Sequence, residues 1–360
     1  MPAGPEFVDH LKAAWDAGDA VFPLDQRLPH TAKQDVVASI QPTIIIDNDG
    51  HQMSHPGKPV ESGDALVVAT SGSTGAPKGV ILTHSAVAAS AHAVHERLSV
   101  THTDRWFACL PVAHVGGLSV ITRSLVTNTR LHVADRFTPE GYDDAADDGC
   151  TLVSLVATAL SRINPSRFRT IVLGGSQPPT ELPPNVVTTY GMTETGSGVA
   201  YNGVPLRDVE IKIVDDEIMV RAPMLFRGYR DGTCPIDSHG WFATGDLGRV
   251  DDSGLLHVHG RRGDLIITGG ENVWPEQVER VLSTDSRISD VCVAGVPDSE
   301  WGHVVTAWIV TEHDLSLDEA RDIVKHSLPA HCAPKRIIRV DVIPRTALGK
   351  PQRSALINSL

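Results

Sequence analysis

The chain has 360 residues, of which 41% are hydrophobic and 21% charged, as in globular proteins long enough for two domains. Its formal net charge of −13 argues against nucleic acid as the main partner, because phosphate backbones bind cationic surfaces. The five cysteines are scattered, the N-terminus lacks a signal-peptide pattern and no apolar run is long enough to span a bilayer, so we expect a cytoplasmic protein without a membrane span.

The first part of the chain alternates between predicted strands and helices. Residues 1–60 predict one helix, at 6–17, followed by loops and a short strand at 43–47. A β-branched run predicts a buried strand at 65–70, and a second strand follows a glycine-rich loop. Later predicted elements are a helix at 85–98 and strands at 130–134, 152–156 and 170–173. This alternation indicates the α/β fold class, with layered sheets flanked by helices.

From residue 209 the pattern changes. Polar and apolar residues alternate at 210–215 and 217–221, which predicts a small antiparallel β region. A charged, glycine-containing segment at 260–264 is a predicted linker. Beyond it, helices at 275–282 and 317–328 and strands at 290–296, 304–311 and 336–342 predict a compact α+β unit. We therefore expect a large N-terminal domain, residues 1–262, and a small C-terminal domain, residues 263–360.

The glycine-rich loop at residues 70–79 reads Thr-Ser-Gly-Ser-Thr-Gly-Ala-Pro-Lys-Gly. Glycines let the backbone approach a phosphate closely, while hydroxyls, amides and Lys78 supply donors to its oxygens. The spacing differs from that of the P-loop, so a P-loop ATPase is disfavoured. Taken alone, the pattern also fits a surface turn.

Three further motifs carry groups suited to a nucleotide. Tyr-Gly-Met-Thr-Glu at 190–194 follows a predicted strand, where α/β proteins place ligands; Tyr190 can stack on a purine and Glu194 can hold Mg²⁺. Asp246 follows a glycine turn and can accept both hydroxyls of a ribose. Lys350 lies on a glycine-containing segment near the C-terminus. The first motif also fits a strand-end turn with a solvated glutamate, and Lys350 also fits a solvated charge.

In this order and spacing, the four motifs resemble those of the adenylate-forming superfamily of acyl-CoA synthetases, luciferases and peptide-synthetase adenylation domains. The resemblance extends over residues 60–353, and the segment 260–275 resembles the family's interdomain motif. It implies an acid–thiol ligase whose ligands are ATP, Mg²⁺, a small carboxylic acid and coenzyme A. It also implies that the N-terminal domain binds ATP and the acid, whereas a mobile C-terminal domain carries a catalytic lysine.

The resemblance assigns a role to each matching residue. Thr193 would bind the α-phosphate, Glu194 the Mg²⁺, and Lys350 would neutralise charge at phosphorus during adenylation. The other ATP-binding residues would be Thr70, Ser71, Gly72, Ser73, Thr74, Gly75 and Lys78 at the phosphates, Gly174, Gly175, Ser176 and Tyr190 at the adenine, Asp246 and Arg261 at the ribose, and Gly191. After rotation of the C-terminal domain, Gly269, Gly270 and Glu271 would meet coenzyme A.

Two features depart from the family's pattern. The usual Asp or Lys at the interdomain hinge is Gly263 here, and glycine absorbs large backbone changes easily. Only about 70 residues precede the glycine-rich loop, fewer than in relatives. The resemblance therefore implies a reduced N-terminal subdomain. A homodimer is among the predicted assemblies of this chain.

Residues 110–119, Leu-Pro-Val-Ala-His-Val-Gly-Gly-Leu-Ser, resemble the acid-pocket motif of the o-succinylbenzoate–CoA ligases of menaquinone biosynthesis. His114, Gly116 and Arg123 would bind the acid, with His114 also counted as catalytic. Arg123 suits the second carboxylate of o-succinylbenzoate, because arginine binds carboxylates through a planar fork. The implied products are o-succinylbenzoyl-AMP and then o-succinylbenzoyl-CoA, with release of pyrophosphate and AMP.

Alternatives remain open at this point. The enzyme could act on another aryl or fatty acid, or be a stand-alone adenylation domain that loads a carrier protein. Arg123 would then be a solvated helix residue and His114 a gate of the acyl pocket. A nucleotide-binding regulatory protein is disfavoured, because a sensor needs neither Glu194 nor Lys350.

Overall fold

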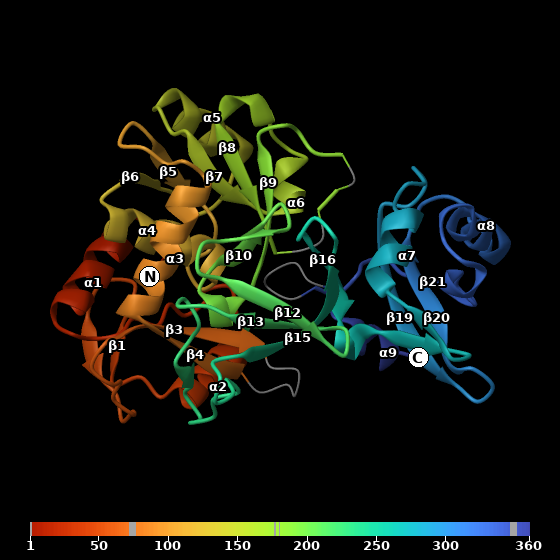
Figure 1. Ribbon diagram of the computed structural model, residues 1–360, viewed down its shortest axis with the longest axis horizontal. Coiled ribbons are helices and arrows are strands. Elements are labelled where there is room, and N and C mark those ends of the chain that lie inside the picture. Colours follow the sequence, from red (N-terminus) through yellow and green to blue (C-terminus); the bar gives the residue numbers. More distant parts are fainter. Residues whose placement is uncertain (1, 72–76, 176–177, 180, 346–350) are drawn as a thin grey trace. The chain divides into compact units, whose positions relative to one another are not determined.

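The computed structural model describes residues 2–71, 77–175, 178–179, 181–345 and 351–360 (Figure 1). The chain divides into two compact units. The first contains Met1–Lys212, Met219–Ala243 and Val250–Leu256, and the second contains Ile213–Ile218, Thr244–Arg249 and His257–Leu360. Layered sheets flanked by helices confirm the predicted α/β fold class. The functional boundary expected between residues 262 and 263 stays a prediction.

The first unit is built on a seven-stranded sheet. Its strand order is β11 (Val204–Pro205), β10 (Gly198–Tyr201), β9 (Val186–Gly191), β8 (Thr170–Leu173), β7 (Leu152–Leu155), β5 (Arg105–Ala108) and β6 (Arg130–Val133). The strands from β6 to β9 pair in parallel, whereas β10 is antiparallel to both β9 and β11. Every residue of β7 and β8 is buried, as expected for parallel strands covered on both faces.

Helices cover both faces of this sheet (Figure 1). Tyr142 of α5 (Pro139–Asp147) and Leu160 of α6 (Ala157–Leu160) pack with Phe107 of β5 in one buried cluster. The neighbouring Trp106 points to the opposite face, because side chains alternate along a strand. There it contacts α3 (His84–Arg97) and α4 (Val115–Thr127) through His95 and Arg123.

The order of the parallel strands creates a switch point between β5 and β7. From β5 the chain passes through α4 to β6 on one side, and then through α5 to β7 on the other. Ligands of open α/β sheets bind outside the carboxyl ends of strands at such a point. The loop 109–114 leaves β5 there, and Gly174 and Tyr190 lie at the carboxyl ends of β8 and β9.

A smaller antiparallel sheet, in the order β14 (Gly228–Tyr229), β4 (Pro77–Thr83) and β3 (Asp64–Ser71), flanks the glycine-rich loop. The helix α2 (His30–Ile40) packs Val36 and Ile40 against Val67 and Ile81 of this sheet. The prediction of loops in this part of the chain was wrong. Tertiary packing stabilises α2, and a local pattern does not reveal such packing. The predicted helix near 6–17 is confirmed as α1 (Pro5–Asp16), and the short strand as β1 (Ile44–Ile46), which pairs with β2 (Gln52–Ser54).

A four-stranded sheet follows in the order β12 (Glu210–Val214), β13 (Glu217–Arg221), β15 (Phe242–Val250) and β16 (Leu256–Arg261). The C-terminal part of the second unit contains β18 (Glu271–Val273), β17 (Ile266–Thr268), β20 (Gly302–Val310) and β19 (Asp290–Asp298), with β21 (Arg336–Arg339) beside β20. The helices α7 (Pro275–Leu282) and α8 (Leu317–Ser327) share its buried core, and both confirm their predicted positions. The last helix is α9 (Arg353–Ile357).

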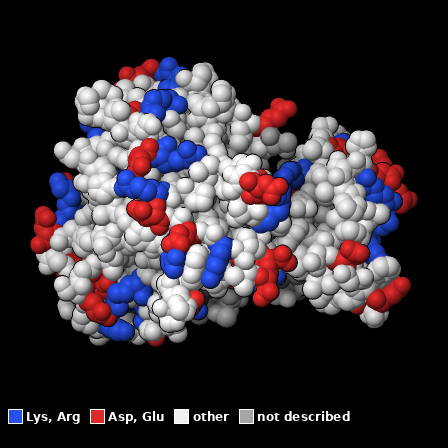
Figure 2. All heavy atoms as spheres, viewed as in Figure 1, with Lys and Arg blue, Asp and Glu red and all other residues white. Residues whose placement is uncertain are grey.

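Acidic and basic side chains are interspersed over the face shown in Figure 2. All five cysteines are free thiols, and only Cys234 is exposed. Among the described residues, no helix combines the length and the apolar character needed to cross a membrane.

Candidate functional site

The ends of the glycine-rich loop are fixed by a β hairpin. Thr70 pairs with Lys78, and Ser71 with Pro77, in the antiparallel register of β3 and β4. Gly72, Ser73, Thr74 and Gly75 lie outside the described residues. The ammonium of Lys78 lies 5.0 Å from the centroid of the Tyr229 ring. The structure thus places the predicted phosphate-binding lysine on a buried sheet, beside a tyrosine that the sequence motifs did not single out.

A rigid turn carries Thr193 and Glu194. The short helix Thr193–Thr195 follows β9, where the Thr195 hydroxyl accepts a hydrogen bond from the Met192 amide at 3.0 Å and donates to the Ser197 carbonyl at 2.6 Å. Thr195 is fully buried, whereas Thr193 and Glu194 are half-buried. At Gly191 a Cβ atom would lie 2.2 Å from the Ser197 carbonyl oxygen, so only glycine fits.

Two hydrogen bonds hold Glu194. The Tyr229 hydroxyl donates to Oε1 at 2.9 Å, and the Phe226 amide donates to the Glu194 carbonyl at 2.8 Å. Carboxylate oxygen is the type of ligand that Mg²⁺ prefers, so the residue present fits the predicted metal role. Sequence reasoning missed Tyr229, which lies 35 residues from Glu194 in the chain.

The predicted adenine-binding residues follow two neighbouring parallel strands. Gly174 comes after β8, and Tyr190 lies at the end of β9. A Cβ atom at Gly174 would meet the Thr189 hydroxyl at 2.7 Å, and Gly175 has a φ of +89°, which favours glycine. Ser176 lies outside the described residues. The sheet therefore brings these two segments to one edge, as the sequence predicted for a ligand site.

In the second unit, Asp246 and Arg261 form an ion pair. Arg261 Nε lies 2.9 Å from Asp246 Oδ1, and the aspartate side chain is only 10% exposed. The Asp246 amide donates to the Thr244 hydroxyl at 3.1 Å, and this hydrogen bond fixes the backbone at residues 244–246. The two residues predicted to bind the ribose are thus neighbours. The predicted catalytic Lys350 lies outside the described residues.

The predicted coenzyme A loop is a tight hairpin between β17 and β18. Gly269 and Gly270 have φ values of +59° and +86°, and Thr268 pairs with Glu271 across the turn. Two-residue hairpins with positive φ at both positions favour glycine. At Gly269 a Cβ atom would also lie 2.7 Å from Cε3 of Trp301. Both glycines and Glu271 are exposed.

His114 caps the N-terminus of α4, where two charged residues approach its Nε2 atom. Arg27 Nη2 lies at 3.2 Å and Asp25 Oδ2 at 3.5 Å. Asp25 is 8% exposed and accepts two side-chain hydrogen bonds from Arg27, at 2.9 and 2.8 Å. Burial raises the pKa of Asp25, but the hydrogen bonds from Arg27 and the nearby positive charges outweigh it, so this pKa lies below its usual value. Nothing in the local sequence distinguishes Asp25 and Arg27 from ordinary loop charges.

Gly116 and Gly117, the first glycines of α4, differ in their surroundings. A Cβ atom at Gly116 would meet only Leu110 Cδ1, at 3.7 Å, so the helix has space beside this residue. At Gly117 it would lie 2.3 Å from the Leu110 carbonyl oxygen. The acid-binding role of Gly116 stays a prediction, and Gly117 is the glycine that the close approach of the loop requires.

Arg123 lies inside the first unit, not on its surface. It is 2% exposed, donates from Nη2 to the Ser197 hydroxyl at 3.0 Å, and its guanidinium lies 4.9 Å from the Trp106 ring centroid. Within the described part of the chain, Nε and Nη1 are buried and have no hydrogen-bond partner. Burial lowers the pKa of Arg123, but a guanidinium keeps its proton in proteins. The alternative of a solvated helix residue is therefore wrong.

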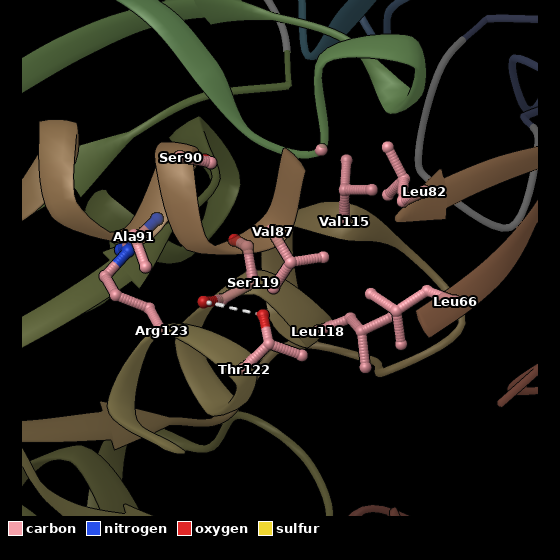
Figure 3. A pocket seen from close by; sticks show the side chains of 11 residues that line it. Leu66, Leu82, Val87, Ser90, Ala91, Val115, Leu118, Ser119, Thr122 and Arg123 are labelled. Atoms are coloured by element: carbon pink, nitrogen blue, oxygen red, sulfur yellow. Dashed lines mark hydrogen bonds between the residues drawn. The ribbon is translucent and has the colours of Figure 1, made fainter. Parts of the chain in front are cut away.

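A pocket lies beside this arginine (Figure 3). Helices α3 and α4, strands β3 and β4 and the turn after Glu194 contribute its lining: Leu66, Leu82, Val87, Ser90, Ala91, Val115, Leu118, Ser119, Thr122, Arg123 and Gly196. Gly196 is only two residues from Glu194, so the pocket adjoins the segment predicted to bind the metal and the α-phosphate. The described residues of its wall are mostly apolar, and Arg123 is the one charged group among them.

Family models and curated relatives match the chain over most of its length. The AMP-binding enzyme model matches residues 47–230, and the model of the AMP-binding enzyme C-terminal domain matches residues 277–350. The 2-succinylbenzoate–CoA ligase of Listeria monocytogenes is 35% identical over 326 residues, which cover 81% of this chain and 69% of the relative. That of Enterococcus faecalis is 33% identical over 327 residues, 79% of this chain and 67% of the relative.

Solved structures are also similar to this chain. The o-succinylbenzoate CoA synthetase from Bacillus subtilis, in complex with the acyl-adenylate intermediate OSB-AMP, is 30% identical with a TM-score of 0.79, over 97% of this chain and 80% of that one. ATP-bound MatB from Rhodopseudomonas palustris shares the fold, with a TM-score of 0.85 at 23% identity. The match covers 98% of this chain and 86% of that one. The chain belongs to the family of AMP-binding enzymes, and within it to the 2-succinylbenzoate–CoA ligases, as the sequence motifs predicted.

Proposed function

We propose that the chain joins 2-succinylbenzoate to coenzyme A at the expense of ATP. In the first step, a carboxylate oxygen of the acid attacks the α-phosphorus, and the bond from that phosphorus to pyrophosphate breaks. In the second step, the thiol of coenzyme A loses its proton and attacks the acyl carbonyl, and AMP leaves. The family, the curated relatives and the B. subtilis complex support this reaction.

The observation that carries the choice of acid is the buried guanidinium of Arg123. 2-Succinylbenzoate keeps an aromatic carboxylate that does not react, and a carboxylate buried in an apolar pocket requires a cationic partner. Within the part of the chain that the structure describes, Arg123 Nε and Nη1 are buried donors without partners, beside a pocket that adjoins the turn of Glu194. A fatty acid would leave these donors unsatisfied, so the geometry favours an acid with a second carboxylate.

The other groups divide the remaining work. Lys78 and the loop before it would hold the β- and γ-phosphates, while Thr193 would hold the α-phosphate. Glu194 would bind Mg²⁺, which supplies positive charge to the phosphate oxygens. Asp246 would accept the ribose hydroxyls, and its ion pair with Arg261 fixes the carboxylate for that contact.

Lys350 would stabilise the charge that develops at phosphorus during adenylation. The hairpin at Gly269 and Gly270 would meet coenzyme A, because glycines leave room for a close approach of the pantetheine arm. We also place the reaction in the cytoplasm, where ATP and coenzyme A are available and where five free thiols are expected. The homodimer stays a prediction.

Pyrophosphate exchange across a panel of acids tests the proposal. We expect ATP–pyrophosphate exchange with 2-succinylbenzoate, little with benzoate or a long fatty acid, and thioester formation once coenzyme A is added. Exchange with a fatty acid but not with 2-succinylbenzoate would refute the choice of acid. Transfer to a carrier protein but not to free coenzyme A would instead indicate a stand-alone adenylation domain.

A further inference from the structure

Tyr229 lies between two parts of the predicted nucleotide site. Its hydroxyl donates a hydrogen bond to Glu194 Oε1 at 2.9 Å, and its ring lies 5.0 Å from the ammonium of Lys78. One side chain therefore contacts both the carboxylate expected to bind Mg²⁺ and the lysine expected to bind the terminal phosphates. We infer that Tyr229 is a positioning residue that sets the carboxylate of Glu194 for the metal and the ammonium of Lys78 for the phosphates; this inference rests on the proposed function.

The backbone fixes Tyr229 relative to Lys78. Strand β14 has only two residues, Gly228 and Tyr229, and pairs with β4 so that Tyr229 lies opposite Val80. On either side of this pair, the Arg227 amide donates to Ile81 at 2.9 Å and the Arg230 amide donates to Gly79 at 2.8 Å. The ring is thus held beside the strand by which the chain leaves the phosphate loop.

Aromatic packing fixes the ring itself. Phe226 meets Tyr229 edge to face at a centroid distance of 4.9 Å, and Phe226 meets Phe242 in the same way at 5.3 Å. Phe226 is 1% exposed, so this cluster is part of the core. Because the Phe226 amide also donates to the Glu194 carbonyl at 2.8 Å, the same segment holds both ends of the glutamate.

The hydrogen bond leaves half of the carboxylate for a metal. Tyr229 engages Oε1, and among the described residues Oε2 of Glu194 has no hydrogen-bond partner. A ligand whose orientation is fixed by an outer partner loses less entropy on binding, and removal of such partners typically weakens metal binding by about 10- to 100-fold. The ring contributes separately, since an aromatic face stabilises a nearby ammonium.

Two substitutions separate these contributions. Tyr229→Phe removes the hydroxyl and keeps the ring, so we expect binding of ATP without metal to be unchanged and binding of Mn²⁺–ATP to weaken by about tenfold. Tyr229→Leu removes the ring as well, so we expect metal-free ATP to bind more weakly too. Binding is measured without acid or coenzyme A, by titration calorimetry and by the paramagnetic signal of Mn²⁺, and therefore does not depend on turnover.

Tyr142→Phe is the matched control. It also removes a tyrosine hydroxyl that bonds an oxygen of the first unit, in this case the Asn164 carbonyl at 3.1 Å, but Tyr142 lies in α5 within the hydrophobic core. We expect it to lower thermal stability and to leave the dependence of ATP binding on Mn²⁺ unchanged. If Tyr229→Phe binds Mn²⁺–ATP like the wild type, or if Tyr142→Phe weakens it equally, the inference is overturned. Failure of the wild type to bind ATP would overturn the proposed function as well, and is thus a distinct result.

Discussion

Replacement of Arg123 by methionine is the sharpest test of the acid site, because binding and stability should respond differently. Methionine removes the charge and keeps a long side chain in the buried space. If the aromatic carboxylate of 2-succinylbenzoate pairs with this guanidinium, its loss should cost ~2–5 kcal/mol, as for other buried charge pairs. That range corresponds to roughly 30- to 4,000-fold in the Michaelis constant of the acid, if this constant follows binding.

The free energy of unfolding should change little. Among the described residues, two buried donor nitrogens of Arg123, Nε and Nη1, lack partners in the wild type, each costing ~1–3 kcal/mol, and methionine removes both. Against this gain, the variant loses the bond to Ser197, worth ~1.5–3 kcal/mol, and the contact with the Trp106 ring, worth up to ~2 kcal/mol. The two sums nearly cancel, so we expect a net change within about 2 kcal/mol of zero.

Arg230→Met is the matched control. Arg230 is also buried, at 8% exposed, but its guanidinium donates to four backbone carbonyls, those of Ile40, Gln41, Lys58 and Pro59. Its removal takes a donor from each of these carbonyls, although that of Gln41 still accepts from the Lys58 amide, so the variant should be destabilised by ~3–5 kcal/mol. Any protein that folds should keep its preference for the dicarboxylate.

The assay is ATP–pyrophosphate exchange with two acids, 2-succinylbenzoate and 3-benzoylpropanoate, which lacks the aromatic carboxylate. Wild-type enzyme should prefer the first acid strongly, and Arg123→Met should abolish most of this preference while the Michaelis constant for ATP stays near that of the wild type. An unchanged ratio between the two acids would refute the reasoning, because Arg123 would then not face the second carboxylate.

Three further predictions concern the second unit. Lys350→Ala should slow adenylation by about 100- to 1,000-fold yet still use preformed acyl-adenylate, and equal loss of both half-reactions would contradict its assignment. Gly269→Ala should slow thioester formation from acyl-adenylate more than Gly270→Ala does, because only the first adds a contact with Trp301, at 2.7 Å. Burial raises the pKa of Glu276, and the attraction of Arg353 offsets this only in part. Folding therefore favours the protonated carboxyl. Its contribution to the free energy of unfolding is lost as the pH rises through the folded-state pKa. In denaturant titrations, Glu276→Gln should therefore be more stable than wild type at pH 8 and lose this advantage as the pH falls toward 4.5, the ordinary value for glutamate; an advantage that grows on acidification would contradict the direction.

The sequence was informative where local chemistry is distinctive. The β-branched runs predicted β3, β7 and β8, and the helices α7 and α8 begin at the predicted residues. The motif at 190–194 lies at the end of a parallel strand, as a ligand-binding segment should. In each case the local structure is determined within about ten residues, by hydrophobic periodicity or by the need for glycine.

The contacts that complete the site join segments distant in the chain, which is why the sequence did not reveal them. Asp25 lies 89 residues before His114, and Tyr229 follows Glu194 by 35 residues. The helix α2 was missed for the same reason, because its apolar residues are stabilised by strands that come later. A single sequence shows which groups are present, but the pairing of those groups depends on the tertiary fold.

Two buried arginines, Arg123 and Arg230, and the half-buried Arg353 show how much this pairing decides. Arg353 donates to Glu276 and Glu279 at 3.0 and 2.9 Å and also lies near Asp264, and Arg230 donates to four carbonyls. Both therefore have enough partners inside the protein to serve the fold alone. Arg123 contacts, among the described residues, one hydroxyl, that of Ser197, and one aromatic face, that of Trp106. The same residue type thus acts structurally where the protein supplies the acceptors. It is suited to recognise an anion where, as for Arg123 among the described residues, its donors are unpaired beside a pocket.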